Sequence, residues 1–194
     1  MFTGIIEEMG KIIDVHKTSD YFTLTLEADQ ILKDIQVGDS ISVNGVCLTA
    51  ASLSPSSFTV DIMPETVNAT NLYQLVEGSY VNLERSMPAN GRFGGHFVSG
   101  HVDGTGKIID KEPESNAVYY RIRTSPEITR YLVMKGSVAV DGASLTVFGV
   151  TEDTFTISLI PHTMEATILG RKASGDVVNI ECDVVGKYIE KLTK

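Results

Sequence analysis

The feature that most constrains this chain is an internal repeat. Residues 100–110 match residues 4–14 through the shared pattern Gly-x5-Gly-Lys-Ile-Ile-Asp, and residues 140–146 match 43–49 after a shift of one position. Further matches follow, with 161–163 over 64–66 and 178–181 over 81–84. Two copies are too few for a solenoid, in which each unit depends on its neighbours. The repeat therefore predicts two similar, self-contained domains.

The two copies meet in a segment rich in glycine and histidine, residues 94–106. Glycine allows the backbone to bend where a Cβ would obstruct it, so this segment is expected to turn several times. We place the first domain at residues 1–96, the second at 97–183 and a C-terminal helix at 184–194. Composition agrees, since 42% hydrophobic residues can supply two small cores.

Charge and composition exclude several classes of protein. The net charge of −9, from 25 acidic and 16 basic residues, argues against a nucleic-acid partner, which requires a cationic face. No apolar run approaches the ~20 residues that span a bilayer, and no secretory signal is recognisable. Cys47 and Cys182 do not correspond between the copies, so we expect reduced thiols and a cytoplasmic location. His16, His96, His101 and His162 show no metal-ligand spacing, and no metal site is expected.

The clearest local signal is a β-hairpin in each copy. Asn44-Gly45 lies between two alternating runs, which favours a two-residue type I′ turn. In that register Val43 faces Val46 and Ser42 faces Cys47, and the second copy repeats the pattern around Asp141-Gly142. The core side would hold Ile41, Val43, Val46 and Leu48, then Val138, Val140, Ala143 and Leu145; the opposite face would hold Ser40, Ser42, Cys47 and Thr49, then Ser137, Ala139, Ser144 and Thr146. Each domain is thus predicted to carry a face of small and hydroxyl-bearing residues outside its core.

Short strands dominate the remaining pattern and indicate an antiparallel barrel or sandwich in each copy. The first strand, or a bent pair, is expected within residues 1–13, and one helical turn within 29–34. Thr66 and Thr163 are candidate helix caps, and Ser125 caps a helix that runs to Leu132. An apolar stripe follows the repeat, formed by Val184, Val185, Tyr188, Ile189 and Leu192. This stripe either packs on its own domain or mediates self-association.

Six motifs in order make the chain resemble the riboflavin synthase family: residues 1–5 (Met-Phe-Thr-Gly-Ile), 43–49, 63–66 (Met-Pro-Glu-Thr), 94–104, 144–146 (Ser-Leu-Thr) and 160–163 (Ile-Pro-His-Thr). The resemblance implies an all-β fold of two homologous six-stranded antiparallel Greek-key β-barrels in tandem plus a C-terminal α-helix. It implies a dismutation in which two molecules of 6,7-dimethyl-8-ribityllumazine exchange a four-carbon unit, giving riboflavin and 5-amino-6-(ribitylamino)pyrimidinedione. No metal or redox cofactor takes part.

The family's assembly is a homotrimer, and its site lies between the first barrel of one chain and the second barrel of a neighbour. Two similar pockets that face each other would fix donor against acceptor, which suits a reaction between two copies of one molecule. Association with lumazine synthase is left open.

Carried over by position, the resemblance assigns a substrate pocket to each copy. The first would use Gly4, Ile5, Ile6, Cys47, Leu48, Thr49, Asp61, Ile62, Met63, Pro64, Glu65 and Thr66. The second would use Gly100, His101, Val102, Ser144, Leu145, Thr146, Leu159, Ile160, Pro161, His162, Thr163 and Met164, with Lys135 reaching across from the adjoining chain.

Catalytic candidates emerge where the copies differ, because a shared fold does not explain divergence. The catalytic set is His101, Cys47, Ser144, Lys135 and Asp183, together with Thr146, which has the same residue, Thr49, in the first copy. The differing counterparts are Ile5 for His101, Gly38 for Lys135 and Ser86 for Asp183, and Cys47 and Ser144 occupy matching positions. His101 is the first candidate for proton transfer. Cys47 is a nucleophile or a polar ring contact, and Ser144 at the matching position favours contact. Lys135 and Asp183 would orient hydroxyls or stabilise the anion. No role is assigned to His16 or His96, and Cys182 is expected to be a packing residue.

A rival interpretation is a non-catalytic lumazine- or flavin-binding antenna protein built on the same duplicated barrels. Such a protein could dispense with polar pocket residues in the second copy, yet His101, Ser144, Thr146 and His162 are all present. A purely structural trimer has only the C-terminal stripe in its favour.

Overall fold

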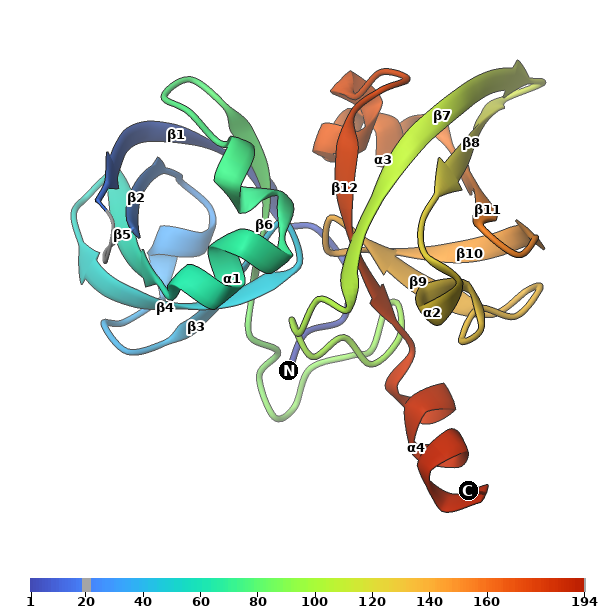
Figure 1. The fold of residues 1–194 in the computed structure, drawn as a ribbon. Coiled ribbons are helices and arrows are strands. Elements are labelled where there is room, and N and C mark those ends of the chain that lie inside the picture. Colours follow the sequence, from blue (N-terminus) through green and yellow to red (C-terminus); the bar gives the residue numbers. More distant parts are fainter. Residues whose placement is uncertain (19–21, 194) are drawn as a thin grey trace.

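A computed structural model describes residues 1–18 and 22–193 and contains two closed β-barrels, with a helix that projects away from the second (Figure 1). The first barrel consists of β1 (Glu8–Lys17), β2 (Phe22–Glu27), β3 (Ser40–Val43), β4 (Val46–Leu53), β5 (Ser57–Ile62) and β6 (Tyr80–Arg85). The second consists of β7 (Gly104–Glu114), β8 (Ala117–Arg123), β9 (Ser137–Val140), β10 (Ala143–Val150), β11 (Thr154–Leu159) and β12 (Val177–Cys182). Both have the same circular strand order, β1-β2-β5-β4-β3-β6 in the first. The predicted fold class, two six-stranded antiparallel barrels and a C-terminal helix, is confirmed.

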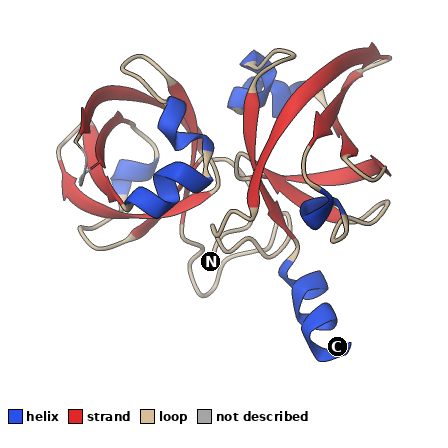
Figure 2. Ribbon diagram, in the orientation of Figure 1, coloured by secondary structure: helices blue, strands red, loops and turns tan. Residues whose placement is uncertain are grey.

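Helices are short and lie mainly at the barrel ends (Figure 2). They are η1 (Ile31–Lys33), α1 (Pro64–Ala69), η2 (Asn71–Gln74), α2 (Pro126–Thr129), α3 (Pro161–Ala166), η3 (Ile168–Arg171) and α4 (Val184–Thr193). The single turn expected within residues 29–34 is η1. The helix that starts after Ser125 ends at Thr129, earlier than predicted, and the first long strand starts at Glu8 because residues 1–7 leave the barrel.

The predicted hairpin register is confirmed in both copies. Val43 pairs with Val46 and Ser42 with Cys47, and Ala139 pairs with Ser144 in the second copy. The turn residues have positive φ, 48° at Asn44 and 81° at Gly45. That conformation is what a type I′ turn requires.

The hairpin face that carries small and hydroxyl-bearing residues is only partly exposed in each barrel. The expectation that this face lies open is therefore wrong. Ser42 and Ala139 are buried, whereas Cys47 and Ser144 are half-buried. Phe2 and Val98 form an isolated antiparallel bridge that, with Ala139, makes a small apolar cluster against Cys47. The chain segments that precede each barrel therefore cover part of these faces.

The hairpin tips of the two barrels touch. A Cβ on Gly45 would lie 2.7 Å from the backbone nitrogen of Gly142, so neither glycine can carry a side chain without a shift. Asn82 Nδ2 donates to the Asp141 carbonyl at 2.8 Å, and Asn179 Nδ2 donates to the Asn44 carbonyl at 2.8 Å. These reciprocal bonds place a pseudo-twofold axis between the barrels.

One charged residue breaks the symmetry of that contact. Asp141 is fully buried, accepts a hydrogen bond from Asn71 Nδ2 at 2.7 Å and lies 3.5 Å from Lys172 Nζ. Burial raises the pKa of the Asp141 carboxyl, and the Lys172 ammonium opposes that rise. The first copy has Asn44 in place of Asp141 and Leu75 in place of Lys172.

Neither threonine predicted as a helix cap has that role. The N-cap residues are Met63 and Ile160, since Pro64 and Pro161 occupy the first helical position, and neither cap makes a side-chain cap bond. Thr66 and Thr163 lie two residues inside their helices. Their hydroxyls are therefore not explained by capping.

Helix α4 projects from the second barrel, and its polar side contacts residues just before β7 and just after α2. Lys187 Nζ lies 2.6 Å from Asp103, and Glu190 contacts Tyr131 and Arg130. The apolar stripe points elsewhere: Val185, Tyr188, Ile189 and Leu192 are 51, 66, 57 and 83% exposed. The alternative in which the stripe packs on its own domain is thus wrong for these four residues. Across the described residues, no helix combines the length and apolar character needed to cross a membrane.

Candidate functional site

A cavity of about 310 Å³ opens on the first barrel, beside the outer face of β4. It is lined by Val46, Cys47, Glu65, Thr66, Ala69, Thr70, Gly100, His101 and Val102. Cys47 faces outward because its neighbours Val46 and Leu48 point into the core. The cavity thus combines a thiol, three residues of helix α1 (Glu65, Thr66 and Ala69) and a histidine from the segment that leads into the second barrel.

The segment around Gly100, which we call the second strap (residues 98–102), is held by hydrogen bonds to both barrels. Cys47 N–H donates to the Gly100 carbonyl at 2.8 Å. The Glu181 carboxylate, on β12, accepts from Ser99 N at 2.7 Å and from Gly100 N at 2.9 Å. The strap therefore lies on the first barrel while its amides are held by the second.

The segment at the N-terminus, the first strap (residues 2–6), repeats this arrangement with the barrels exchanged. Ser144 N–H donates to the Gly4 carbonyl at 2.8 Å. Glu84, on β6, accepts from Thr3 N at 2.7 Å and from Gly4 N at 3.0 Å. Burial raises the pKa of the Glu84 carboxyl, and the bonds from Thr3 and Gly4 oppose the rise.

This crossing corrects the grouping expected from the sequence. The first strap, assigned to the pocket of Cys47, lies beside Ser144, whereas the second strap, assigned to the pocket of Ser144, lies beside Cys47. The Phe2–Val98 bridge joins the straps where they cross. Each candidate pocket is therefore completed by the strap that precedes the other copy's barrel, and His101 belongs with Cys47.

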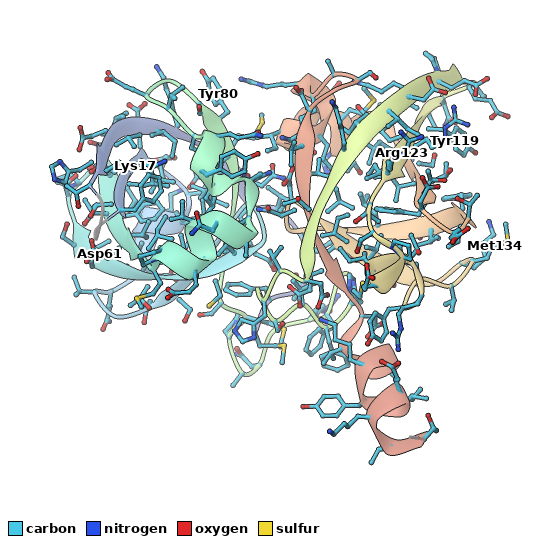
Figure 3. The ribbon with its side chains drawn as sticks, viewed as in Figure 1. Lys17, Asp61, Tyr80, Tyr119, Arg123 and Met134 are labelled. Atoms are coloured by element: carbon cyan, nitrogen blue, oxygen red, sulfur yellow. The ribbon has the colours of Figure 1, made fainter. Side chains whose placement is uncertain are left out.

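Four of the predicted contact residues have side chains in the barrel cores. These residues are Leu48, Ile62, Leu145 and Leu159. Asp61 lies at the side of the first barrel remote from the second, where it accepts from Thr23 Oγ1 at 2.8 Å (Figure 3). The four core residues can present only backbone atoms to a ligand.

The remaining candidates of the second barrel are distributed along it. Ser144 and Thr146 point outward from β10, and His162 and Thr163 lie in the first turn of α3. Lys135 has a positive φ of 67° where the first copy has Gly38, and its ammonium lies 4.1 Å from the centre of the Phe148 ring. Its neighbour Met134 lies at the outer edge of the second barrel (Figure 3). Lys135 therefore lies beside Phe148 of β10 and does not line the cavity at Cys47.

Asp183 lies between β12 and α4, and its carboxylate accepts from Val185 N at 3.0 Å at the start of that helix. Cys182, read as packing, is buried, and burial raises the pKa of its thiol to about 12. Both cysteines are free. Cys47 lines the cavity of the first barrel, whereas Cys182 lies in the core of the second.

His96 is the functional candidate that the sequence did not reveal. Its Nδ1 lies 2.6 Å from Ser144 Oγ. Burial lowers the pKa of the His96 imidazole, although the carboxylates of Asp183 and Glu181 act in the opposite direction. The only signal was its place in the glycine-rich segment, five residues before His101.

Comparisons with known proteins agree with this pair of barrels. The Lumazine binding domain family matches residues 3–86 and 99–183. Riboflavin synthase from Bacillus subtilis (strain 168) is 59% identical over 97% of the chain and 88% of its own length. The Schizosaccharomyces pombe riboflavin synthase is 45% identical over 100% of the chain and 94% of its own length. A crystal structure of LumP complexed with riboflavin has the same fold, with a TM-score of 0.87 and 24% identity over 94% of this chain and 99% of that one.

The two barrels and the repeated family match define a protein with tandem lumazine-binding domains. At these levels of identity and coverage, the chain belongs to the riboflavin synthase family.

Proposed function

We infer that the chain catalyses the dismutation of 6,7-dimethyl-8-ribityllumazine, in which one molecule transfers a four-carbon unit to a second. The products are riboflavin and 5-amino-6-(ribitylamino)pyrimidinedione. The observation that carries this inference is the pair of strap-completed barrels in a chain 59% identical to a riboflavin synthase. Two related pockets suit two identical substrates, because catalysis then depends on holding donor and acceptor in a fixed orientation.

We assign the ring-binding surface to the hairpin and strap backbones, and the ribityl chain to the first turns of α1 and α3. Glu65 and Thr66 supply carboxylate and hydroxyl groups in the first pocket, and His162 and Thr163 occupy the corresponding positions in the second. Thr66 is not a helix cap, which leaves its hydroxyl available to a ligand.

His101 is proposed to take the proton from the 7-methyl group of a lumazine bound in the first pocket. It lines the same cavity as Cys47, and histidine is the side chain that most often acts as a general acid or base in enzymes. Cys47 and Ser144 contact the rings as polar groups, and Thr146 completes the outer face of β10. Lys135 and Asp183 are proposed to act at the pocket of a neighbouring chain.

The proposed assembly is a cytoplasmic homotrimer. Contact between the first pocket of one chain and the second pocket of another is heterologous, and heterologous contacts close into rings. The exposed stripe on α4 supplies an apolar surface for that contact. Association with lumazine synthase would be tested by co-sedimentation of the two proteins.

One incubation with 6,7-dimethyl-8-ribityllumazine tests the activity. Riboflavin should appear by its absorbance, with two lumazine molecules consumed for each riboflavin formed. The alternative function, a lumazine- or flavin-binding antenna protein, has the support of the LumP structures, which are 23–24% identical and share the fold. An antenna protein would bind the lumazine and leave it intact.

A further inference from the structure

The side chain of Ser144 is enclosed by three segments. Its backbone N–H donates to the Gly4 carbonyl, and a Cβ on Gly95 would lie 2.7 Å from its Oγ. The ring of His96 approaches from the same segment as Gly95, with Nδ1 2.6 Å from Oγ. The serine hydroxyl therefore has little conformational freedom. The direction of its O–H bond depends on whether His96 Nδ1 or Ser144 Oγ is the donor of the hydrogen bond between them.

The other ring nitrogen of His96 restricts the choice. Nε2 is buried and has no hydrogen-bond partner within residues 1–18 and 22–193. A proton on Nε2 would leave a buried N–H unsatisfied, and such orphaned donors are rare in folded proteins. An Nε2 without a proton is an unsatisfied acceptor, which is the more tolerated of the two states. Burial lowers the pKa of the His96 ring and so disfavours the doubly protonated form, although the Asp183 and Glu181 carboxylates favour that form.

We propose that His96 is a positioning residue whose Nδ1–H donates to Ser144 Oγ and so turns the serine hydroxyl proton toward the substrate in the second pocket. Ser144 is then a fixed hydrogen-bond donor, suited to a carbonyl oxygen or an unprotonated ring nitrogen of the lumazine. This inference rests on the proposed function, because it takes the second pocket to be a lumazine site.

The assignment also separates the chemistry of the two pockets. Cys47 occupies the position of Ser144 in the first copy, and a thiol is a much weaker donor than a hydroxyl. The second pocket would therefore hold ring acceptors more firmly than the first.

Two substitutions of similar shape test the direction of the bond. His96→Asn keeps an N–H near the position of Nδ1, whereas His96→Asp offers only acceptor oxygens and would draw the serine proton away from the pocket. Riboflavin serves as the probe, because it binds without turnover. Titrations are made in a Cys47→Phe background that fills the first cavity, and binding of one riboflavin per chain verifies that only the second pocket is measured.

We expect riboflavin affinity within about threefold of the parent for His96→Asn and a loss of about tenfold or more for His96→Asp, the size of one hydrogen bond. In a Ser144→Ala background the two variants should bind alike, because His96 acts through the serine. Nitrogen-15 NMR of labelled histidine should show His96 with the proton on Nδ1. Thermal unfolding of every variant identifies those that fail to fold, and the NMR spectrum of the unsubstituted protein decides the tautomer without any substitution.

The proposal is overturned if the spectrum places the proton on Nε2, or if His96→Asp binds as tightly as His96→Asn. An unsubstituted protein that forms riboflavin but gives either of these results refutes the inference alone. A protein that neither binds riboflavin nor forms it refutes the proposed function as well.

Discussion

Alanine at either strap glycine should disable one pocket and spare the other. Gly100 and Gly4 have φ of +81° and +77°, and a Cβ on them would lie 2.6 Å from the Cβ of Cys47 and of Ser144 respectively. A left-handed conformation costs an alanine about 1–2 kcal/mol, of which the stiffer unfolded chain returns about 0.4–1. Overpacking adds about 1–3 kcal/mol. We therefore expect Gly100→Ala and Gly4→Ala each to lower the free energy of unfolding by about 2–4 kcal/mol.

Two other glycines separate the strain from the clash. Gly78 and Gly175 have φ of +88° and +103°, and a Cβ on either would meet nothing within 4 Å. Gly78→Ala and Gly175→Ala should therefore cost only the conformational part, about 1 kcal/mol. Urea unfolding measures both pairs of variants, and the difference between the pairs isolates the steric contact.

Riboflavin titration then assigns the damage to a pocket. Gly100→Ala should weaken the site beside Cys47 by about tenfold or more, because the clash is relieved by moving the second strap and breaking the Cys47–Gly100 bond. Gly4→Ala should weaken the site beside Ser144 instead. The crossed arrangement would be refuted if Gly100→Ala unfolded like Gly78→Ala and still bound two riboflavins per chain with unchanged affinity.

Three further predictions concern catalysis and assembly. Cys47→Ser should retain measurable turnover, because Ser144 fills the matching position, while Cys47→Phe should abolish it; a serine variant that binds lumazine but never turns over would indicate a thiol-specific role. Truncation after Asp183 removes the exposed stripe of α4 and should lower the assembly size and the activity on dilution, measured by sedimentation and turnover; a monomer with full activity would refute the inter-chain site. A fragment of residues 1–95 lacks the second strap, so it should bind riboflavin only when two copies pair and exchange first straps; binding by a monomeric fragment would contradict this.

Local rules predicted the hairpins well. A two-residue turn fixes the register of its strands, and period-two alternation then assigns each side chain to a face. The start of α1 could also have been read correctly, since Pro64 suits the first helical position and excludes Thr66 as a cap. The prediction of Thr66 as the cap was wrong because it gave more weight to that threonine than to Pro64.

The crossing of the straps was beyond local rules. Both copies carry the same strap pattern, so the sequence is equally compatible with Gly4 beside Cys47 and with Gly4 beside Ser144. The outcome is decided by contacts between residues more than fifty positions apart, Cys47 with Gly100 and Ser144 with Gly4. Ser42 lies close to Gly142, and His96 contacts Ser144. Both neighbours belong to the second copy, so local patterns did not predict either contact.

Differences between the two copies gain meaning from this arrangement. The groups that hold the straps are the same in kind, with Glu84 and Glu181 each accepting backbone amides and a hydroxyl. The groups beside the pockets differ, with Cys47 against Ser144 and His101 against Ile5. The two substrates are chemically identical, so any distinction between donor and acceptor must come from the protein. A shared scaffold that presents unlike side chains at equivalent points provides that distinction while keeping the two rings in the same geometry.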